Sequence, residues 1–205
     1  MADSYTQVPP NSTGNKLRTR TRVIGVDTVH EQAVFTGAMP TYYALADAVA
    51  LAANKHHISI FNASGSGSLV SIKKLFQINL SLAAVTGVAL RFDMKRTTAQ
   101  SAGTAITPAS MDSNNPALPA QITVNTNGTI TESTLLYPFV TQSDEVTAAN
   151  TAVANYLTQY GNLMLESMEM QEVRLREGQG FTVKQITSST VGSFAWLMAF
   201  TVESL

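Results

Sequence analysis

The sequence predicts a mainly all-β protein: an antiparallel β-sandwich of jelly-roll-like type, with an extended N-terminal arm and one or two short helices. Apolar and polar residues alternate along several segments of the 205-residue chain, and turn-forming residues separate these segments. Only 13% of the residues are charged, whereas a typical soluble protein has about 25%. We expect an arm over residues 1–22 and a single β-sandwich domain over residues 23–205.

The first 22 residues have the composition of an arm rather than of a core. Pro9-Pro10 and the polar residues that follow them cannot form a packed interior. In the segment KLRTRTR, alternation places Arg18, Arg20 and Arg22 on one face of an extended chain. Together with Lys16, these arginines form a candidate interaction site for a neighbouring subunit or an acidic partner. A solvated, disordered tail remains the alternative.

Three segments alternate most clearly. From residue 70 to 82 the apolar residues occupy the even positions, apart from Lys74 on the apolar face and Leu75 on the polar face. Residues 88–94 follow the same rule, and the loop Ala83–Gly87 is predicted to join the two as a hairpin. The third segment, residues 194–202, carries the only tryptophan and is expected to cross the middle of the core.

Weaker patterns predict the remaining elements. Strands are expected at residues 29–35, 57–62, 122–124, 135–139, 163–170 and 181–186. Two segments have apolar residues at helical spacing, which predicts helices over Thr41–Lys55 and Asp144–Tyr160.

The stretch Ser64-Gly65-Ser66-Gly67-Ser68 raises the question of a phosphate-binding loop. Such a loop needs a lysine after its last glycine and a helix that follows. Here Ser68-Leu69 follows Gly67, and the next segment is a predicted strand. The stretch therefore predicts a hairpin loop.

No pattern in the chain predicts catalysis or a cofactor. There is no cysteine, and His56 and His57 are neighbours that would face opposite sides of a strand. Glutamates at 166, 169, 172 and 177 are more typical of a solvated edge than of an acid–base pair. The first 22 residues contain no apolar stretch of the kind found in signal peptides, so we expect none. No apolar run is long enough to span a membrane, and the basic residues are scattered. We expect no enzyme activity, metal, cofactor, small-molecule substrate, membrane contact or specific nucleic-acid binding.

Three longer segments carry a resemblance to a known family. They are ALAANKHHISIFNASGSGSLVSIKKLFQINL, TGVALRFDMKRTTAQSAGTAITPASMDSNNPALP and VRLREGQGFTVKQITSSTVGSFAWLMAFTVE. Together, over roughly residues 44–203, they resemble tailed-bacteriophage virion structural proteins of jelly-roll or β-sandwich type. The resemblance implies a fold and an assembly role, and carries over no functional residue.

The expected function is therefore structural. The leading hypothesis is a capsid decoration or cement protein that is part of the virion, assembles in the host bacterial cytoplasm, and contacts both itself and other virion proteins such as the major capsid protein. A neck, tail or baseplate ring subunit is the first alternative. A carbohydrate-binding module for receptor recognition is the second, with tyrosines 42, 43, 137, 156 and 160 as its candidate platforms.

Overall fold

The computed structural model describes residues 3–7, 16–24, 27–32, 39–80, 88–142 and 172–204. The chain divides into two units, Met1–Ala38 and Met39–Leu205. In the first unit, strands β1 (Asp3–Gln7), β2 (Lys16–Ile24) and β3 (Asp27–Gln32) form an antiparallel sheet in the order β1-β2-β3. The four basic residues proposed as an interaction site all lie on β2, at every second position.

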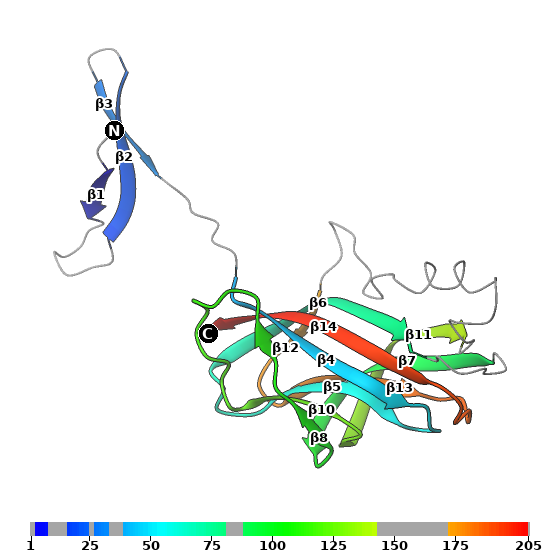
Figure 1. Ribbon diagram of the computed structural model, residues 1–205. Coiled ribbons are helices and arrows are strands. Elements are labelled where there is room, and N and C mark those ends of the chain that lie inside the picture. The colour runs from blue at the N-terminus through cyan, green and yellow to red at the C-terminus, as the bar shows by residue number, and fades with distance from the viewer. Residues whose placement is uncertain are drawn as a thin grey trace, which may run out of the picture. The chain divides into compact units, whose positions relative to one another are not determined.

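The described strands of the second unit form two antiparallel sheets (Figure 1). The five-stranded sheet has the order β12-β6-β14-β4-β9. Its strands are β12 (Val173–Leu175), β6 (Ser68–Asn79), β14 (Ser193–Ser204), β4 (Thr41–Ala50) and β9 (Ala109–Ser110). The six-stranded sheet has the order β11-β7-β13-β5-β10-β8. Its strands are β11 (Thr129–Gln142), β7 (Ala89–Ser101), β13 (Gln179–Gln185), β5 (His56–Asn62), β10 (Ile122–Thr126) and β8 (Thr104–Ile106).

The core combines residues from both sheets, so the all-β prediction is confirmed and the fold is β-sandwich-like. The predicted alternation of the C-terminal strand is also confirmed, because Phe194, Trp196, Met198 and Phe200 are all fully buried. The rings of Trp196 and Phe92, which come from different sheets, meet edge to face at 5.2 Å. Strands also occur at or near the weaker predictions 29–35, 57–62, 122–124, 135–139 and 181–186.

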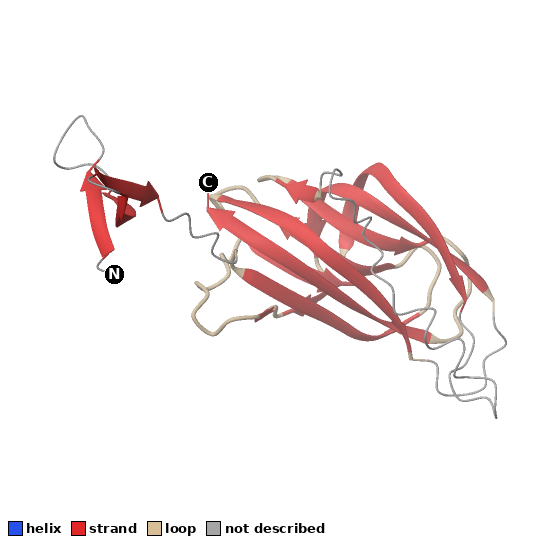
Figure 2. Ribbon diagram, turned by 90° about the horizontal axis from the view of Figure 1, so that it is seen from above, coloured by secondary structure: helices blue, strands red, loops and turns tan. Residues whose placement is uncertain are grey.

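The predicted helix over Thr41–Lys55 is wrong, because residues 41–50 form strand β4. Its buried residues Tyr42, Ala44 and Ala46 alternate with exposed ones, and the strand pairs with β14. The intrinsic preference of alanine for a helix is well under about 1 kcal/mol per residue. The free energy gained when β4 pairs with β14 and buries its inner face readily exceeds this preference. The described residues contain no helix (Figure 2), and so none that could cross a membrane. The helix predicted at 144–160 and the strand predicted at 163–170 lie outside the described residues.

Both predicted hairpins are wrong. The loop Ser64–Ser68 connects β5 to β6, and these strands belong to different sheets. The segment Ala83–Gly87 lies outside the described residues, but the flanking strands β6 and β7 also belong to different sheets. Strands that are close in sequence often pair, whereas a sandwich requires some connections to pass from one sheet to the other.

Strand β6 departs from its predicted pattern because it contains a β-bulge. Along β14, Ala199 pairs with Lys74 but the next residue, Phe200, pairs with Ile72, so Lys73 is an extra residue. The inner face of β6 therefore changes phase: Val70 and Ile72 are buried on one side of the bulge, and Leu75, Gln77 and Asn79 on the other. The prediction that Phe76 and Ile78 face the core is wrong. They pair with Leu197 and Ala195, on the outer face of the sheet.

Candidate functional site

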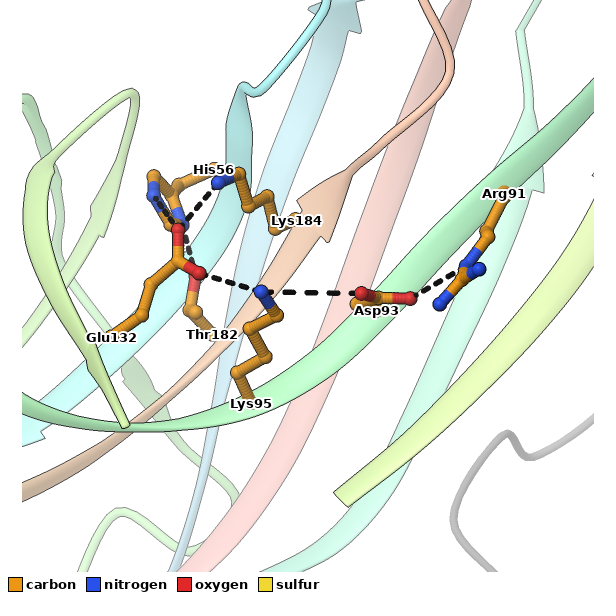
Figure 3. A network of polar contacts seen from close by, with 7 residues as sticks. All are labelled: His56, Arg91, Asp93, Lys95, Glu132, Thr182 and Lys184. Atoms are coloured by element: carbon orange, nitrogen blue, oxygen red, sulfur yellow. Dashed lines mark hydrogen bonds and ion pairs between the residues drawn. The ribbon is translucent and has the colours of Figure 1, made fainter. Parts of the chain in front are cut away.

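The outer face of the six-stranded sheet carries a group of charged side chains (Figure 3). Strand β7 directs Leu90, Phe92 and Met94 into the core, so the residues between and after them face outward. We call the group the charged network. It comprises Arg91, Asp93 and Lys95 on β7, Glu132 on β11, Thr182 and Lys184 on β13, and His56 on β5.

Glu132 is the centre of the charged network. One carboxylate oxygen accepts a hydrogen bond from Nζ of Lys184 at 2.5 Å, and the other accepts one from Nζ of Lys95 at 2.6 Å. Partial burial raises the pKa of Glu132, but the hydrogen bonds and charges of the two lysines outweigh that effect and hold the pKa below its ordinary value. Lys95 also lies 3.9 Å from Asp93, which accepts a hydrogen bond from Nε of Arg91 at 2.9 Å.

His56 lies at the edge of the charged network. Its Nδ1 is 3.0 Å from the hydroxyl oxygen of Thr182, and its Nε2 is 3.5 Å from Glu132. Burial lowers the pKa of His56, the charge of Glu132 raises it, and the charges of Lys184 and Lys95 lower it further, with a net lowering. The neighbouring His57 lies in the core, where its ring meets Phe92 edge to face at 5.1 Å. The prediction that the two histidines face opposite sides is confirmed, so they cannot bind one ion together.

The charged network holds neighbouring strands together through ion pairs, and we call this arrangement a cross-strand tie. Glu132 links the edge strand β11 to β7 and β13 through ion pairs at both carboxylate oxygens. Within the residues that the structure describes, no group of three or more His, Cys, Asp or Glu side chains could hold a metal ion.

The glycine-rich loop Ser64–Ser68 does bind an anionic group, and that group belongs to the chain itself. The backbone N–H of Gly67 donates a hydrogen bond to the Glu177 carboxylate at 2.7 Å. Backbone hydrogen bonds from Gly67 and Gly65, together with the side chain of Ser66, lower the pKa of Glu177. Gly65 and Gly67 have φ values of +84° and +60°, which favour glycine and turn their amides toward the carboxylate.

The other predicted site residues are dispersed. Tyr42 is buried, and its hydroxyl donates to the carbonyl of Pro116 at 2.5 Å, so it cannot serve as a carbohydrate platform. Tyr43 and Tyr137 are exposed but belong to different sheets. Of the four glutamates, Glu172 pairs with Lys73 and Arg174 and Glu177 binds the glycine-rich loop, whereas 166 and 169 lie outside the described residues, as do Tyr156 and Tyr160.

Sequence reasoning missed the charged network. Its members come from four strands whose order in the sheet does not follow the sequence, so only the structure brings them together. The available signal was the alternation of Arg91, Asp93 and Lys95 with apolar residues, which predicts one charged face on that strand.

Exposed apolar side chains form the second notable feature. On β11, Leu135, Leu136, Tyr137 and Val140 are exposed, and Val140 keeps 68% of its accessible surface. Three register shifts interrupt the pairing of this edge strand with β7. On β4, Tyr43 and Leu45 are exposed on the outer face of the five-stranded sheet. Groups of exposed apolar side chains on a folded domain are typical of interaction surfaces.

The described residues of the second unit form a β-sandwich-like fold of two antiparallel sheets, with ion pairs that join strands of one sheet and with exposed apolar side chains on β4 and β11. Comparison of the chain with protein-family models, with curated protein sequences and with solved structures found no match.

Proposed function

We propose that the chain is a non-enzymatic structural subunit of a tailed-bacteriophage virion, most specifically a capsid decoration or cement protein. The observation that carries this proposal is the combination of a low charged fraction with exposed apolar side chains on two different strands, β4 and β11. Such surfaces suit a protein that is held by its neighbours, because each contact removes apolar area from water.

The sites in the second unit support an assembly role over catalysis. In the charged network, the carboxylate of Glu132 is paired with Lys95 and Lys184. At the glycine-rich loop, the carboxylate of Glu177 accepts a hydrogen bond from the backbone N–H of Gly67. These ion pairs and hydrogen bonds join segments of the subunit itself and so stabilise it. The proposal includes a jelly-roll arrangement of the strands and a location in the virion, with the major capsid protein and further copies of the chain as partners.

The proposal also gives the N-terminal segment a role as an arm. Lys16, Arg18, Arg20 and Arg22 occupy alternate positions of β2, so the sequence places four basic residues on one face of that strand. A chain without residues 1–22 should fold but load less onto particles. Equal loading of the truncated and full chains would remove the arm from the proposal.

The test of the function is the protein content of purified virions, measured by quantitative mass spectrometry. A decoration protein should be present in a constant ratio to the major capsid protein, on the order of one copy per one to a few capsid subunits, because it follows the symmetry of the shell. A neck or tail ring subunit would instead be present in about six or twelve copies per particle. Absence of the chain from purified virions would overturn the proposal.

A further inference from the structure

The C-terminal part of β11 is a regular sheet edge. Among the described strands, β11 pairs with β7 and with no other. The register shifts that interrupt this pairing all lie between Thr131 and Tyr137. From Tyr137 to Gln142 the pairing with β7 continues residue by residue without a shift. We call residues 138–142 the β11 edge.

The hydrogen bonds of β7 determine which backbone groups of the β11 edge point away from the sheet. The carbonyl oxygen of Arg91 accepts a hydrogen bond from the N–H of Ile186 at 2.9 Å, and the N–H of Arg91 donates to the hydroxyl of Thr187 at 2.8 Å. Both partners directly follow β13, so the backbone of Arg91 is engaged on the β13 side. Arg91 lies opposite Val140. In an antiparallel ladder this makes a non-hydrogen-bonded pair, so the N–H and C=O of Val140 point away from β7.

The alternation of the ladder gives the direction of the neighbouring groups. Pro138 and Gln142 also direct their backbone away from β7. Phe139 and Thr141 direct theirs toward it. Proline has no N–H, so the outward groups are the C=O of Pro138 and both the N–H and the C=O of Val140 and Gln142. In the part of the chain that the structure describes, no hydrogen bond reaches the outward groups of Pro138 or Val140.

The β11 edge carries no charge that would keep a second strand away. Natural sheet edges are commonly protected by charged side chains, especially lysine. Residues 133–142 read STLLYPFVTQ and include no charged residue. The side chain of Val140, in the middle of the edge, keeps 68% of its accessible surface. An uncharged, exposed edge with outward N–H and C=O groups is suited to pairing with another β-strand.

We propose that the β11 edge pairs, antiparallel, with the β11 edge of a second copy of the chain about a twofold axis through Val140. This inference rests on the assembly role proposed above and names one self-contact within it. In a twofold contact the same edge serves both copies, so the pair closes on itself. The six-stranded sheets of the two copies then continue as one sheet.

An axis through Val140 matches donors with acceptors along the whole β11 edge. Val140 lies opposite its own copy, and the two residues exchange two N–H···O=C hydrogen bonds. Gln142 lies opposite Pro138 of the second copy, and its N–H donates to the proline carbonyl. The one ladder bond that is missing on each side is the bond that needs an N–H on Pro138. An axis through Pro138 would instead set two residues without a donor against each other.

Side chains and charges near the axis are compatible with this contact. The exposed side chains of Val140 from the two copies meet at the axis, apolar against apolar. Arg91, which lies opposite Val140 on β7, would be three strand spacings from its own copy, roughly 14 Å. This separation exceeds the Debye length of about 8 Å at physiological ionic strength, so repulsion between the two arginines is largely screened.

A single pair of strands is a small interface. It buries less than the roughly 800 Å² per partner that is usual for a stable specific contact. We therefore expect a weak dimer in solution, which becomes effective when several contacts act together on one particle.

Amide hydrogen exchange of the full chain, followed residue by residue by NMR, tests the pairing. Between about 20 μM and about 1 mM protein, exchange at Val140 and Gln142 should slow as the dimer forms. Phe139 and Thr141, whose N–H groups face β7, should be protected at every concentration. A wild-type chain that stays monomeric at about 1 mM, or exchange at Val140 that does not depend on concentration, would overturn the edge contact.

Three substitutions test the register, with the dimer Kd measured by sedimentation equilibrium. Val140→Pro removes the two N–H donors at the axis and should raise the Kd about tenfold, whereas it removes no hydrogen bond of the monomer. Val140→Lys sets two like charges opposite each other and should weaken the dimer by a similar factor. Pro138→Ala supplies the missing N–H on each copy and should lower the Kd about tenfold.

The matched control is Leu45→Lys, which adds the same charge at an exposed apolar position of β4 and should dimerise as the wild type does. Circular dichroism should show that all variants are folded. Unchanged Kd in both Val140 variants would overturn the edge contact, and unchanged Kd in Pro138→Ala would overturn the axis through Val140. Growth beyond a dimer would contradict a twofold pair, since an open contact keeps adding copies. A monomeric chain that still occurs in virions would refute this pairing alone, whereas a dimer absent from virions would refute only the proposed function.

Discussion

The indole N–H of Trp196 donates a hydrogen bond to Nδ1 of His57 at 3.2 Å, and this bond joins the inner faces of the two sheets. The other ring nitrogen, Nε2, lies 3.0 Å from Oε1 of Gln185. The amide Nε2 of Gln185 donates to the carbonyls of Thr187 and Ser189, so its oxygen must point at the histidine. His57 is therefore neutral with the proton on Nε2, and a second proton on Nδ1 would face the indole N–H.

The first prediction concerns acid stability. Burial lowers the pKa of His57 to about 4, whereas the unfolded chain has the ordinary value of about 6.5. Because the folded value is the lower one, the contribution of His57 is fully present above pH 6.5 and is lost as the pH falls toward 4. The free energy of unfolding should decrease by about 3 kcal/mol over this interval, measured by denaturant titration at several pH values.

Variants separate His57 from the other titrating groups. His57→Gln should be less stable at pH 7.5 but should lose most of the pH dependence between 6.5 and 5. His56→Gln should keep most of it, because the core histidine is intact. An unchanged slope in His57→Gln would show that another group carries the acid sensitivity.

The second prediction concerns Gly180 on β13. A β-carbon there would lie 2.3 Å from Oγ1 of Thr97 and 2.7 Å from the carbonyl oxygen of Ile60, which is closer than atoms can approach. Gly180→Ala should therefore lower the free energy of unfolding by about 1–3 kcal/mol or more. Gly128→Ala is the matched control, since the nearest atom to its β-carbon lies at 3.6 Å, and it should change stability little. Equal effects of the two substitutions would mean that the strands around Gly180 move apart enough to accommodate the β-carbon, which would contradict this prediction.

The third prediction concerns the tie formed by Glu132. Glu132→Gln should leave Lys95 and Lys184 without their shared counter-ion and destabilise the domain by about 1–2 kcal/mol, a value reduced because the carboxylate is a quarter exposed. Hydrogen exchange of β11 amides should accelerate more than that of β14 amides, because the tie holds the edge strand. The exposed Glu203→Gln is the control and should affect neither. Uniform acceleration in both strands would contradict a local tie.

The fourth prediction concerns the glycine-rich loop. NMR titration should give Glu177 a pKa below the ordinary value, and the amide shift of Gly67 should follow the same curve, because that N–H donates to the carboxylate. As the pH falls through this lowered pKa, the bond weakens and the loop should become more mobile. In Glu177→Gln the Gly67 shift should no longer titrate. A Gly67 amide that still titrates in this variant would assign the effect to another carboxylate.

Much of the fold could be predicted from sequence because period two is a strong signal. The C-terminal strand followed its pattern from Phe194 to Val202, with every even position buried. Strand β4 was missed because its alanines suit a helix, and only its pairing with β14 reveals that they line the inner face of a sheet. The local sequence pattern also could not predict which strands pair. Strand β6 follows β5 and precedes β7 in the chain, yet it belongs to the other sheet.

The candidate sites depended on long-range geometry in the same way. Glu132 and Lys184 are 52 residues apart in sequence, so no spacing rule could bring them together. By contrast, the anomaly at Lys74 and Leu75 was visible in the sequence and coincides with the bulge. From the sequence alone, these two residues could equally be a local break in an otherwise constant alternation. Only the pairing with β14 shows that the alternation shifts by one residue and stays shifted for the rest of β6.

The bulge at Lys73 means that the length of β6, rather than its composition, determines what the sheet presents outside. Deleting this one residue would leave every other side chain unchanged yet would exchange the two faces of the rest of the strand. Phe76 and Ile78 would turn inward, and Gln77 and Asn79 would reach solvent. Loss of this one residue would therefore move two apolar side chains into the core and two polar side chains to the outer face of β6.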